Sequence, residues 1–161
     1  MYSHRIATRD DLEVLWNRNI AENPGDPRWL RWKKEFIENN RSGRIKTFVV
    51  LFNDVPVGEG SLILTASHPA ICGQTRLADG KNTVNINALR ILKEHEGKGQ
   101  ISALVRMMED WARGQGFKTI TIGAEAAEAR NLAIYLHWAY TDFISHEMDG
   151  DQLVVYYGKT L

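Results

Sequence analysis

The sequence contains a single cysteine, Cys72, among its 161 residues. One cysteine cannot build a disulfide framework or a cysteine-based zinc site. The longest apolar run, residues 48–52, is far shorter than the roughly 18–20 residues that a membrane-spanning helix needs. No apolar run follows the first five residues, as it would in a signal peptide. We therefore expect a soluble, cytoplasmic protein that does not contact a membrane.

The sequence also lacks an excess of charge of either sign, since 20 basic residues balance 20 acidic ones. A protein that coats nucleic acid normally has a strong basic excess, so we expect no nucleic-acid partner. The neutral total conceals a gradient: residues 23–46 carry seven basic and three acidic side chains, and residues 121–151 carry one basic and six acidic. Such asymmetry can shape a cleft, or it can form two solvated faces.

No repeat, low-complexity tract or Pro/Gly/Ser-rich linker divides the chain, so the sequence predicts one domain over residues 1–161. Period-two and helical hydrophobic patterns alternate along it. We expect a helix capped by Thr8, and a second helix that begins with Asp26 as a capping carboxylate and Pro27 at its first position. The predicted strands are 2–7, 47–52, 55–66, 84–92, 118–123, 142–148 and 152–159. The predicted helices are 8–19, one from 26, one from 101 that stops at 114–116, and 131–139.

Asn53-Asp54 and Asp149-Gly150 are typical hairpin turns between these strands. Residues 67–82 form a longer loop, and its length favours a functional role. The element order indicates an α/β protein with a mixed sheet and helices available to both faces.

The most informative segment is 91–102, in which a strand runs into a turn with Gly97 and Gly99 and a helix starts at once. Glycine allows successive N–H groups to point into one concavity, and the new helix adds its unpaired amides. Such a concavity favours an anion such as phosphate, although glycines also occur in tight turns without a ligand. The segment is neither a nucleoside-triphosphate loop nor a dinucleotide-binding fingerprint, because the required spacings are absent.

Residues 96–101, EGKGQI, resemble the acyl-CoA-binding motif Arg/Gln-x-x-Gly-x-Gly/Ala of the GNAT superfamily of N-acetyltransferases. Residues 131–140 resemble the family's later helix, which carries a tyrosine and ends in Gly-Phe. Ala139-Tyr140 stands in that place here. Two motif positions differ, because Glu96 replaces Arg/Gln and Ile101 replaces Gly/Ala, and we expect the Glu96 side chain to point outward.

The resemblance implies a GNAT-like α/β fold with a mixed, mostly antiparallel sheet of about seven strands flanked by about four helices. It also implies acetyl-CoA as cosubstrate and no metal. The strand edge at Ile91 and Leu92 would position the pantetheine arm, and Asn131 would bond the arm or cap its helix. The pyrophosphate would lie on the loop formed by Glu96, Gly97, Lys98, Gly99, Gln100, Ile101 and Ser102.

Tyr135 matches the family tyrosine by its spacing and is the candidate general acid for the departing thiolate, although it could be a core tyrosine. We favour Glu59, which lies between two glycines in a central strand, as the general base. The alternatives to Glu59 are Glu125 and two histidines that could titrate near neutrality, His95 and His137. Asn85 and Asn87 would orient an amine if their strand face lines the cleft.

In this family the acceptor is chosen by the region between the first two helices, here 19–32, and by variable loops such as 67–82. Trp29 and Trp32 could wall an acceptor pocket or pack in the core. We expect an enzyme that transfers an acetyl group directly to a primary amine of a small molecule or peptide, and a homodimer is compatible with the sequence. The alternatives are a non-catalytic acyl-CoA-binding or sensor module and a purely structural domain.

Overall fold

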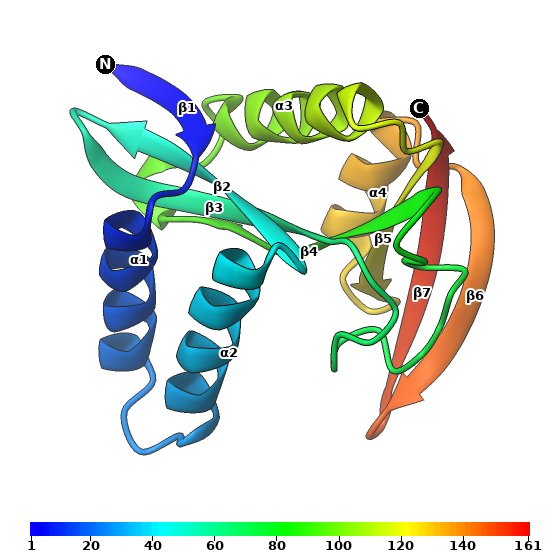
Figure 1. The fold of residues 1–161 in the computed structure, drawn as a ribbon, viewed down its shortest axis with the longest axis horizontal. Helices are drawn as coiled ribbons and strands as arrows, with labels where there is room; N and C mark the ends of the chain where they lie inside the picture. Colours follow the sequence, from blue (N-terminus) through cyan, green and yellow to red (C-terminus); the bar gives the residue numbers. More distant parts are fainter. The chain divides into compact units, whose positions relative to one another are not determined.

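A computed structural model describes all 161 residues. The chain forms two compact units, residues 1–62 with 88–108 and residues 63–87 with 109–161 (Figure 1). Its seven strands form a mixed sheet in the order β1-β2-β3-β4-β5-β7-β6. The predicted α/β class, with about seven strands and four helices, is confirmed.

The first unit contains β1 (Tyr2–Ile6), α1 (Arg9–Glu22), α2 (Arg28–Ser42), β2 (Ile45–Phe52) and β3 (Val55–Ile63), apart from the last residue of β3. It also holds the second half of β4 (Thr83–Ile91), a short 3-10 helix (Lys93–His95) and the first part of α3 (Gln100–Gly114). β1 and β2 pair antiparallel. In Figure 1, α1 and α2 lie on one side of these strands and α3 lies on the other. The core between them includes Trp16, Ile45, Phe48 and Leu62.

Local sequence signals explain how the elements of this unit begin and end. Thr8 caps α1 as predicted, because its Oγ1 accepts the Asp11 N–H. The Asp11 carboxylate accepts the Thr8 N–H in turn, which completes a capping box. The turn at Asn53-Asp54 is confirmed, and both residues have positive φ, 49° and 66°, as a tight hairpin turn requires. The start of α2 differs by one residue: Pro27 is the N-cap, and Asp26 accepts the Arg28 N–H.

The second unit contains β5 (Thr119–Glu125), α4 (Ala129–His137), β6 (Asp142–Asp149) and β7 (Gln152–Thr160). β7 pairs antiparallel with both β5 and β6. The hairpin between β6 and β7 turns at Gly150-Asp151 rather than Asp149-Gly150, because Asp149 still pairs with Gln152. Residues 64–82 contain no helix or strand, so the predicted loop at 67–82 is confirmed.

Strand β4 contributes to both units. The alternation of its side chains between the two faces of the sheet is interrupted at Ala88, where φ is +54°. Its first half pairs parallel with β5 from Thr83 to Ile86. Asn85 is buried there, and its Nδ2 donates to Thr121 Oγ1 at 2.9 Å. The amide of Asn85 therefore holds β4 against β5 and is not available to orient an amine.

None of the helices combines the length and the apolar character needed to cross a bilayer.

Candidate functional site

The glycine loop joins the 3-10 helix to α3 in the first unit. Gly97 and Gly99 have φ values of +70° and +73°, in the left-handed region that favours glycine. The loop's backbone N–H groups from residue 97 to 102 donate to no acceptor of the chain, and the first intrahelical bond of α3 is donated by Ala103 to Gly99. Unpaired amides at the start of a helix, with the positive end of the helix dipole, form a site for an anion.

The side chains of the loop leave this row of amides uncovered. Glu96 and Lys98 are exposed. The Lys98 ammonium bonds back to the Glu94 carbonyl at 2.8 Å, and the Gln100 amide bonds to the Lys98 carbonyl at 3.1 Å. The anion-binding capacity of the loop therefore comes mainly from its backbone.

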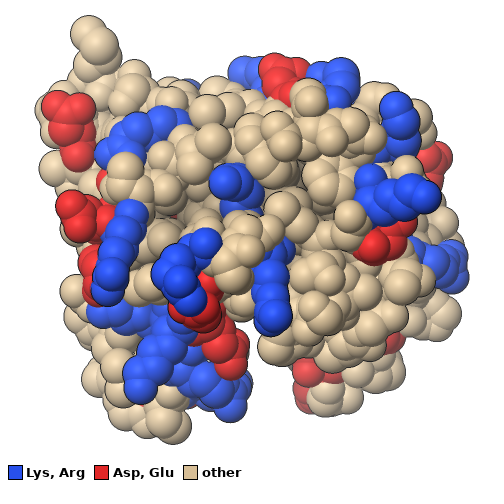
Figure 2. Space-filling model, in the orientation of Figure 1, with Lys and Arg blue, Asp and Glu red and all other residues tan.

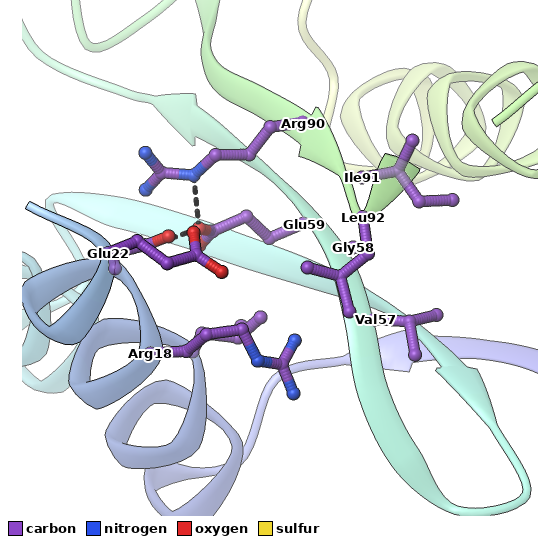
Figure 3. Close-up of a pocket in the computed structure, with 10 residues that line it drawn as sticks. Arg18, Glu22, Val57, Gly58, Glu59, Arg90, Ile91 and Leu92 are labelled. Atoms are coloured by element: carbon purple, nitrogen blue, oxygen red, sulfur yellow. Dashed lines mark hydrogen bonds and ion pairs between the residues drawn. The ribbon is translucent and has the colours of Figure 1, made fainter. Parts of the chain in front are cut away.

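A pocket lies in the same unit, between α1 and the strands β3 and β4 (Figure 3). The space between its lining residues measures about 360 Å³, part of which is open solvent. Gly58 allows the strands to approach here, because a Cβ on it would lie 3.0 Å from Ile91 Cγ1 and 3.1 Å from the Arg90 carbonyl oxygen. The lining residues are Leu15, Arg18, Asn19, Glu22, Val57, Gly58, Glu59, Arg90, Ile91 and Leu92.

The pocket thus brings together three of the residues predicted from sequence, namely Glu59, Ile91 and Leu92. Glu59 is 1% exposed. Its Oε1 accepts Arg90 Nε at 2.6 Å and, more weakly, Asn19 Nδ2 at 3.4 Å. Figure 3 shows the Arg90 and Glu59 side chains directed toward each other across the pocket wall.

The Glu59–Arg90 ion pair is incomplete. Glu59 Oε2 and Arg90 Nη2 are both buried and have no hydrogen-bond partner. A buried polar atom without a partner typically costs about 1–3 kcal/mol, and more when it is charged. The arrangement therefore leaves one acceptor and one donor of the ion pair unsatisfied.

Arg90 was missed by the sequence reasoning. Its guanidinium lies over two indole rings, 5.1 Å from the centroid of Trp16 and 5.5 Å from that of Trp29. A signal was present, because a carboxylate predicted in a central strand needs a cationic partner. Arg90 is the only arginine in the next strand, but the pairing of β3 with β4 is a tertiary contact.

The backbone of β4 distinguishes Ile91 from Leu92. The Leu92 N–H donates to the Val57 carbonyl at 2.8 Å, so it is used within the sheet. Because successive peptide groups of a strand point in opposite directions, the Ile91 N–H is directed away from β3. The pairing of β4 with β5 extends only to Ile86, so this amide lies beyond the paired part of that edge.

Tyr135 and Asn131 belong to α4 in the second unit. Burial, and then the negative charge of Glu128, raises the pKa of Tyr135 above its ordinary value, so the phenol stays protonated at neutral pH. The hydroxyl bonds to no group of the chain, and the ring packs against Trp138 at a centroid distance of 5.9 Å. Asn131 is exposed in the first turn and is not the helix cap, because Glu128 occupies that position.

Other predicted candidates have separate surroundings. His95 Nδ1 bonds to the Tyr2 hydroxyl at 2.7 Å, which joins the 3-10 helix to β1. His137 and Glu125 are exposed, at the ends of α4 and β5. Trp29 and Trp32 are half-buried, so neither belongs to the fully buried core. Their ring centroids lie 5.2 Å apart.

The basic segment 23–46 is largely a solvated face. Figure 2 shows basic and acidic side chains intermixed over α1 and α2. Several of its basic residues form ion pairs, among them Arg28 with Asp26, Arg31 with Glu35, Lys33 with Glu13 and Arg41 with Glu38.

Comparison with known proteins identifies the class. The model of the acetyltransferase (GNAT) family matches residues 9–139, so the chain belongs to this family and the predicted resemblance is confirmed. No curated protein matches the chain.

Solved structures share the fold at low sequence identity. The yncA protein of Salmonella typhimurium, with its cofactor acetyl-CoA, has a TM-score of 0.69 at 15% identity, over 99% of this chain and 94% of that one. A ribosomal-protein-alanine N-acetyltransferase from Brucella melitensis has a TM-score of 0.70 at 18% identity, with 99% of both chains covered. The aminoglycoside acetyltransferase AAC(6')-Ib in complex with coenzyme A has a TM-score of 0.73 at 16% identity, over 99% and 95%.

Proposed function

We propose that the protein is an acyl-CoA-dependent N-acetyltransferase, which moves an acetyl group from acetyl-CoA to a primary amine of a small molecule or peptide. The observation that carries this proposal is the row of unpaired amides at Gly97–Ser102, which is suited to a pyrophosphate, in a chain of the GNAT family. Structural relatives bound to acetyl-CoA or coenzyme A support the choice of cosubstrate.

The residues present fit acetyl-CoA as a substrate. The loop from Glu96 to Ser102 would hold the pyrophosphate through its backbone. Leu92 would border the pantetheine arm, and Asn131 would bond it. The Ile91 amide, which is directed away from β3, would polarise the thioester carbonyl.

The proposed reaction is direct transfer without a covalent enzyme intermediate. The amine nitrogen attacks the thioester carbonyl carbon, a C–N bond forms and the C–S bond breaks. Glu59 takes the proton that the amine loses, and Tyr135 donates a proton to the departing thiolate. Cys72 is exposed and its Sγ lies against the Pro69 carbonyl, where no neighbouring base would activate it as a nucleophile.

A non-catalytic acyl-CoA sensor is the second candidate. The observation that favours it is the replacement of two motif positions by Glu96 and Ile101. A sensor would keep the row of amides but would not use Tyr135 or Glu59 for turnover.

The first experiment measures thermal unfolding with acetyl-CoA, with coenzyme A and without ligand. A ligand that binds only the folded state at 100 times its dissociation constant stabilises the protein by about 2.7 kcal/mol. For a chain of this size, the expected rise in melting temperature is about 5–10 °C. No shift at millimolar acetyl-CoA would contradict both the enzyme and the sensor.

The second experiment follows the release of free thiol from acetyl-CoA with a panel of amines. Thiol release that depends on the amine, together with an acetylated product seen by mass spectrometry, is expected. Slow hydrolysis that no amine accelerates would favour the sensor.

A further inference from the structure

The pocket beside Glu59 contains two unsatisfied polar atoms of opposite hydrogen-bonding character. Glu59 Oε2 can only accept while the carboxylate is ionised, and Arg90 Nη2 can only donate. Their side chains are joined through Oε1 and Nε at 2.6 Å, so the two unsatisfied atoms belong to one cluster. A ligand that satisfies both must present a donor and an acceptor a few bonds apart.

The charges that line the pocket also restrict the ligand. Glu22 and Glu59 are acidic, and Arg18 and Arg90 are basic, so the lining has no net charge. A polycationic amine would need an acidic excess there. A zwitterion, which carries its own positive and negative group, matches a balanced lining.

The geometry of Arg90 favours a carboxylate as the acceptor group. Its guanidinium is held over the Trp16 and Trp29 rings, and its Nε is fixed by Glu59. Stacking and the ion pair orient the remaining N–H groups before a ligand arrives, and a planar guanidinium pairs well with a carboxylate. The Arg90 side chain is 34% exposed and Trp29 is half-buried, so the solvent side of the cluster lies at these two residues.

We propose that the acceptor is a free α-amino acid, whose amine bonds to Glu59 and whose carboxylate bonds to Arg90. This inference rests on the proposed N-acetyltransferase function and specifies its substrate class. The product is an N-acetyl amino acid. The ammonium group of the amino acid first loses one proton to solvent, so that a neutral amine attacks the thioester carbonyl carbon. The C–N bond forms as the C–S bond of acetyl-CoA breaks, Glu59 takes the second proton that the nitrogen loses, and Tyr135 protonates the thiolate, so that coenzyme A leaves as the thiol.

The test uses the twenty common L-amino acids and five decarboxylated counterparts, namely histamine, tryptamine, tyramine, cadaverine and agmatine. Binding is measured by thermal shift in the presence of coenzyme A, and turnover by thiol release from acetyl-CoA. At least one amino acid should raise the melting temperature and be acetylated. For histidine, tryptophan, tyrosine, lysine or arginine, kcat/KM should exceed that of the matching amine at least tenfold. Equal or faster acetylation of the decarboxylated amines, or no response to any amino acid, would overturn the proposal.

Tyrosinamide, which keeps the amine and replaces the carboxylate by an amide, tests the competing peptide substrate. A preference for tyrosinamide over tyrosine would show that Arg90 serves a peptide carbonyl, and the free amino acid would be rejected.

Arg90→Gln tests the carboxylate contact, with Arg90→Lys as the conservative variant. Arg90→Gln should raise KM for the best amino acid at least tenfold and reduce its advantage over the decarboxylated amine, and Arg90→Lys should restore part of both. Arg41→Gln is the matched control, because Arg41 pairs with Glu38 at the exposed end of α2 and does not line the pocket. Unchanged discrimination in Arg90→Gln would overturn the assignment.

The two proposals fail in different ways. If an amino acid binds in an Arg90-dependent manner but no amine is acetylated, the acceptor site stands and the enzymatic function fails. If amines without a carboxylate are the preferred substrates, the enzymatic function stands and the amino-acid specificity fails.

Discussion

Burial acts differently on the two side chains that we propose for proton transfer. Tyr135 has a pKa raised by burial and a hydroxyl that no group of the chain occupies, which suits a proton donor. Glu59 is more deeply buried but is held by Arg90, so its carboxylate remains beside a positive charge.

Replacing Tyr135 by phenylalanine should lower kcat about 100-fold, because the thiolate would leave without its acid. KM for acetyl-CoA should change less than about threefold, since the ring and its contact with Trp138 remain. Steady-state kinetics of thiol release measure both. Tyr157→Phe is the control, as Tyr157 lies in β7 and packs against Phe143. Equal rates in the wild type and Tyr135→Phe would remove Tyr135 from the mechanism.

At the scale of single residues, the sequence predicted some of the site residues but not their tertiary contacts. Glu59 could be selected because a charged residue in an apolar strand, between two glycines, demands an explanation. The need of that carboxylate for a cationic partner was also visible, but choosing Arg90 required the pairing of β3 with β4, because Glu59 lies more than 30 residues away in the chain. Asn85 was assigned to a possible cleft face, but it is buried against Thr121. The positive φ of Ala88 interrupts the alternation of the strand, and it could not be predicted because the residue is not a glycine.

At the scale of elements, the glycine loop can be tested with a matched pair of substitutions. Gly99 and Gly150 both have positive φ, and an added Cβ would meet no atom within 4 Å at either position. Alanine at each should therefore lower the free energy of unfolding by about 1–2 kcal/mol through backbone strain alone. Only Gly99→Ala should also weaken acetyl-CoA binding, measured by calorimetry, because only that loop carries the row of unpaired amides.

If Gly150→Ala weakens the affinity for acetyl-CoA as much as Gly99→Ala does, the effect reflects general destabilisation. The loop would then lose its assigned role in binding the pyrophosphate.

The capping box of α1 predicts a pH-dependent stability. Burial alone would raise the pKa of Asp11, but its hydrogen bonds with Thr8 and its ion pair with Arg5 hold the pKa below its ordinary value of 3.8. A depressed pKa contributes stability above the ordinary value, and this stability is lost as the pH falls through the pKa of the folded state. Asp11→Asn should therefore cost about 1–2 kcal/mol at pH 7.

The difference between wild type and Asp11→Asn should narrow below about pH 4, as urea unfolding at several pH values would measure. Asp10→Asn provides the control, because Asp10 is exposed in the same first turn but takes no part in the capping box. A difference that stays constant down to pH 3 would show that the Asp11 charge is not what stabilises the helix.

Local patterns predicted the type of every α-helix and strand, but they missed the short 3-10 helix Lys93–His95 and placed the ends of elements less well. Helix α1 continues to Glu22 rather than to residue 19, and β3 ends at Ile63 rather than at residue 66. Residues 64–66 are apolar or β-branched, as in a strand, but they lie outside β3. Such ends depend on tertiary contacts that a local pattern does not contain.

At the scale of the whole molecule, the order of elements and the family resemblance together predicted the fold class. The position of β7 between β5 and β6 could not be read from periodicity, because strand patterns specify faces but not neighbours. The pairing of the last strand with β5 joins residues far apart in the chain, from Glu125 with Val154 to Thr119 with Thr160.

The division into two units has a consequence for synthesis of the chain. The first unit takes residues 1–62 and 88–108, and the second takes residues 63–87 and 109–161, so each is assembled from separated segments. As the chain emerges from the ribosome, the first unit lacks its second segment until residue 108 has been translated. Residues 63–87 cannot form their unit until residues 109–161 have been translated as well. No contiguous stretch encodes either unit alone, so a gene segment carrying only one of them could not be moved to another protein.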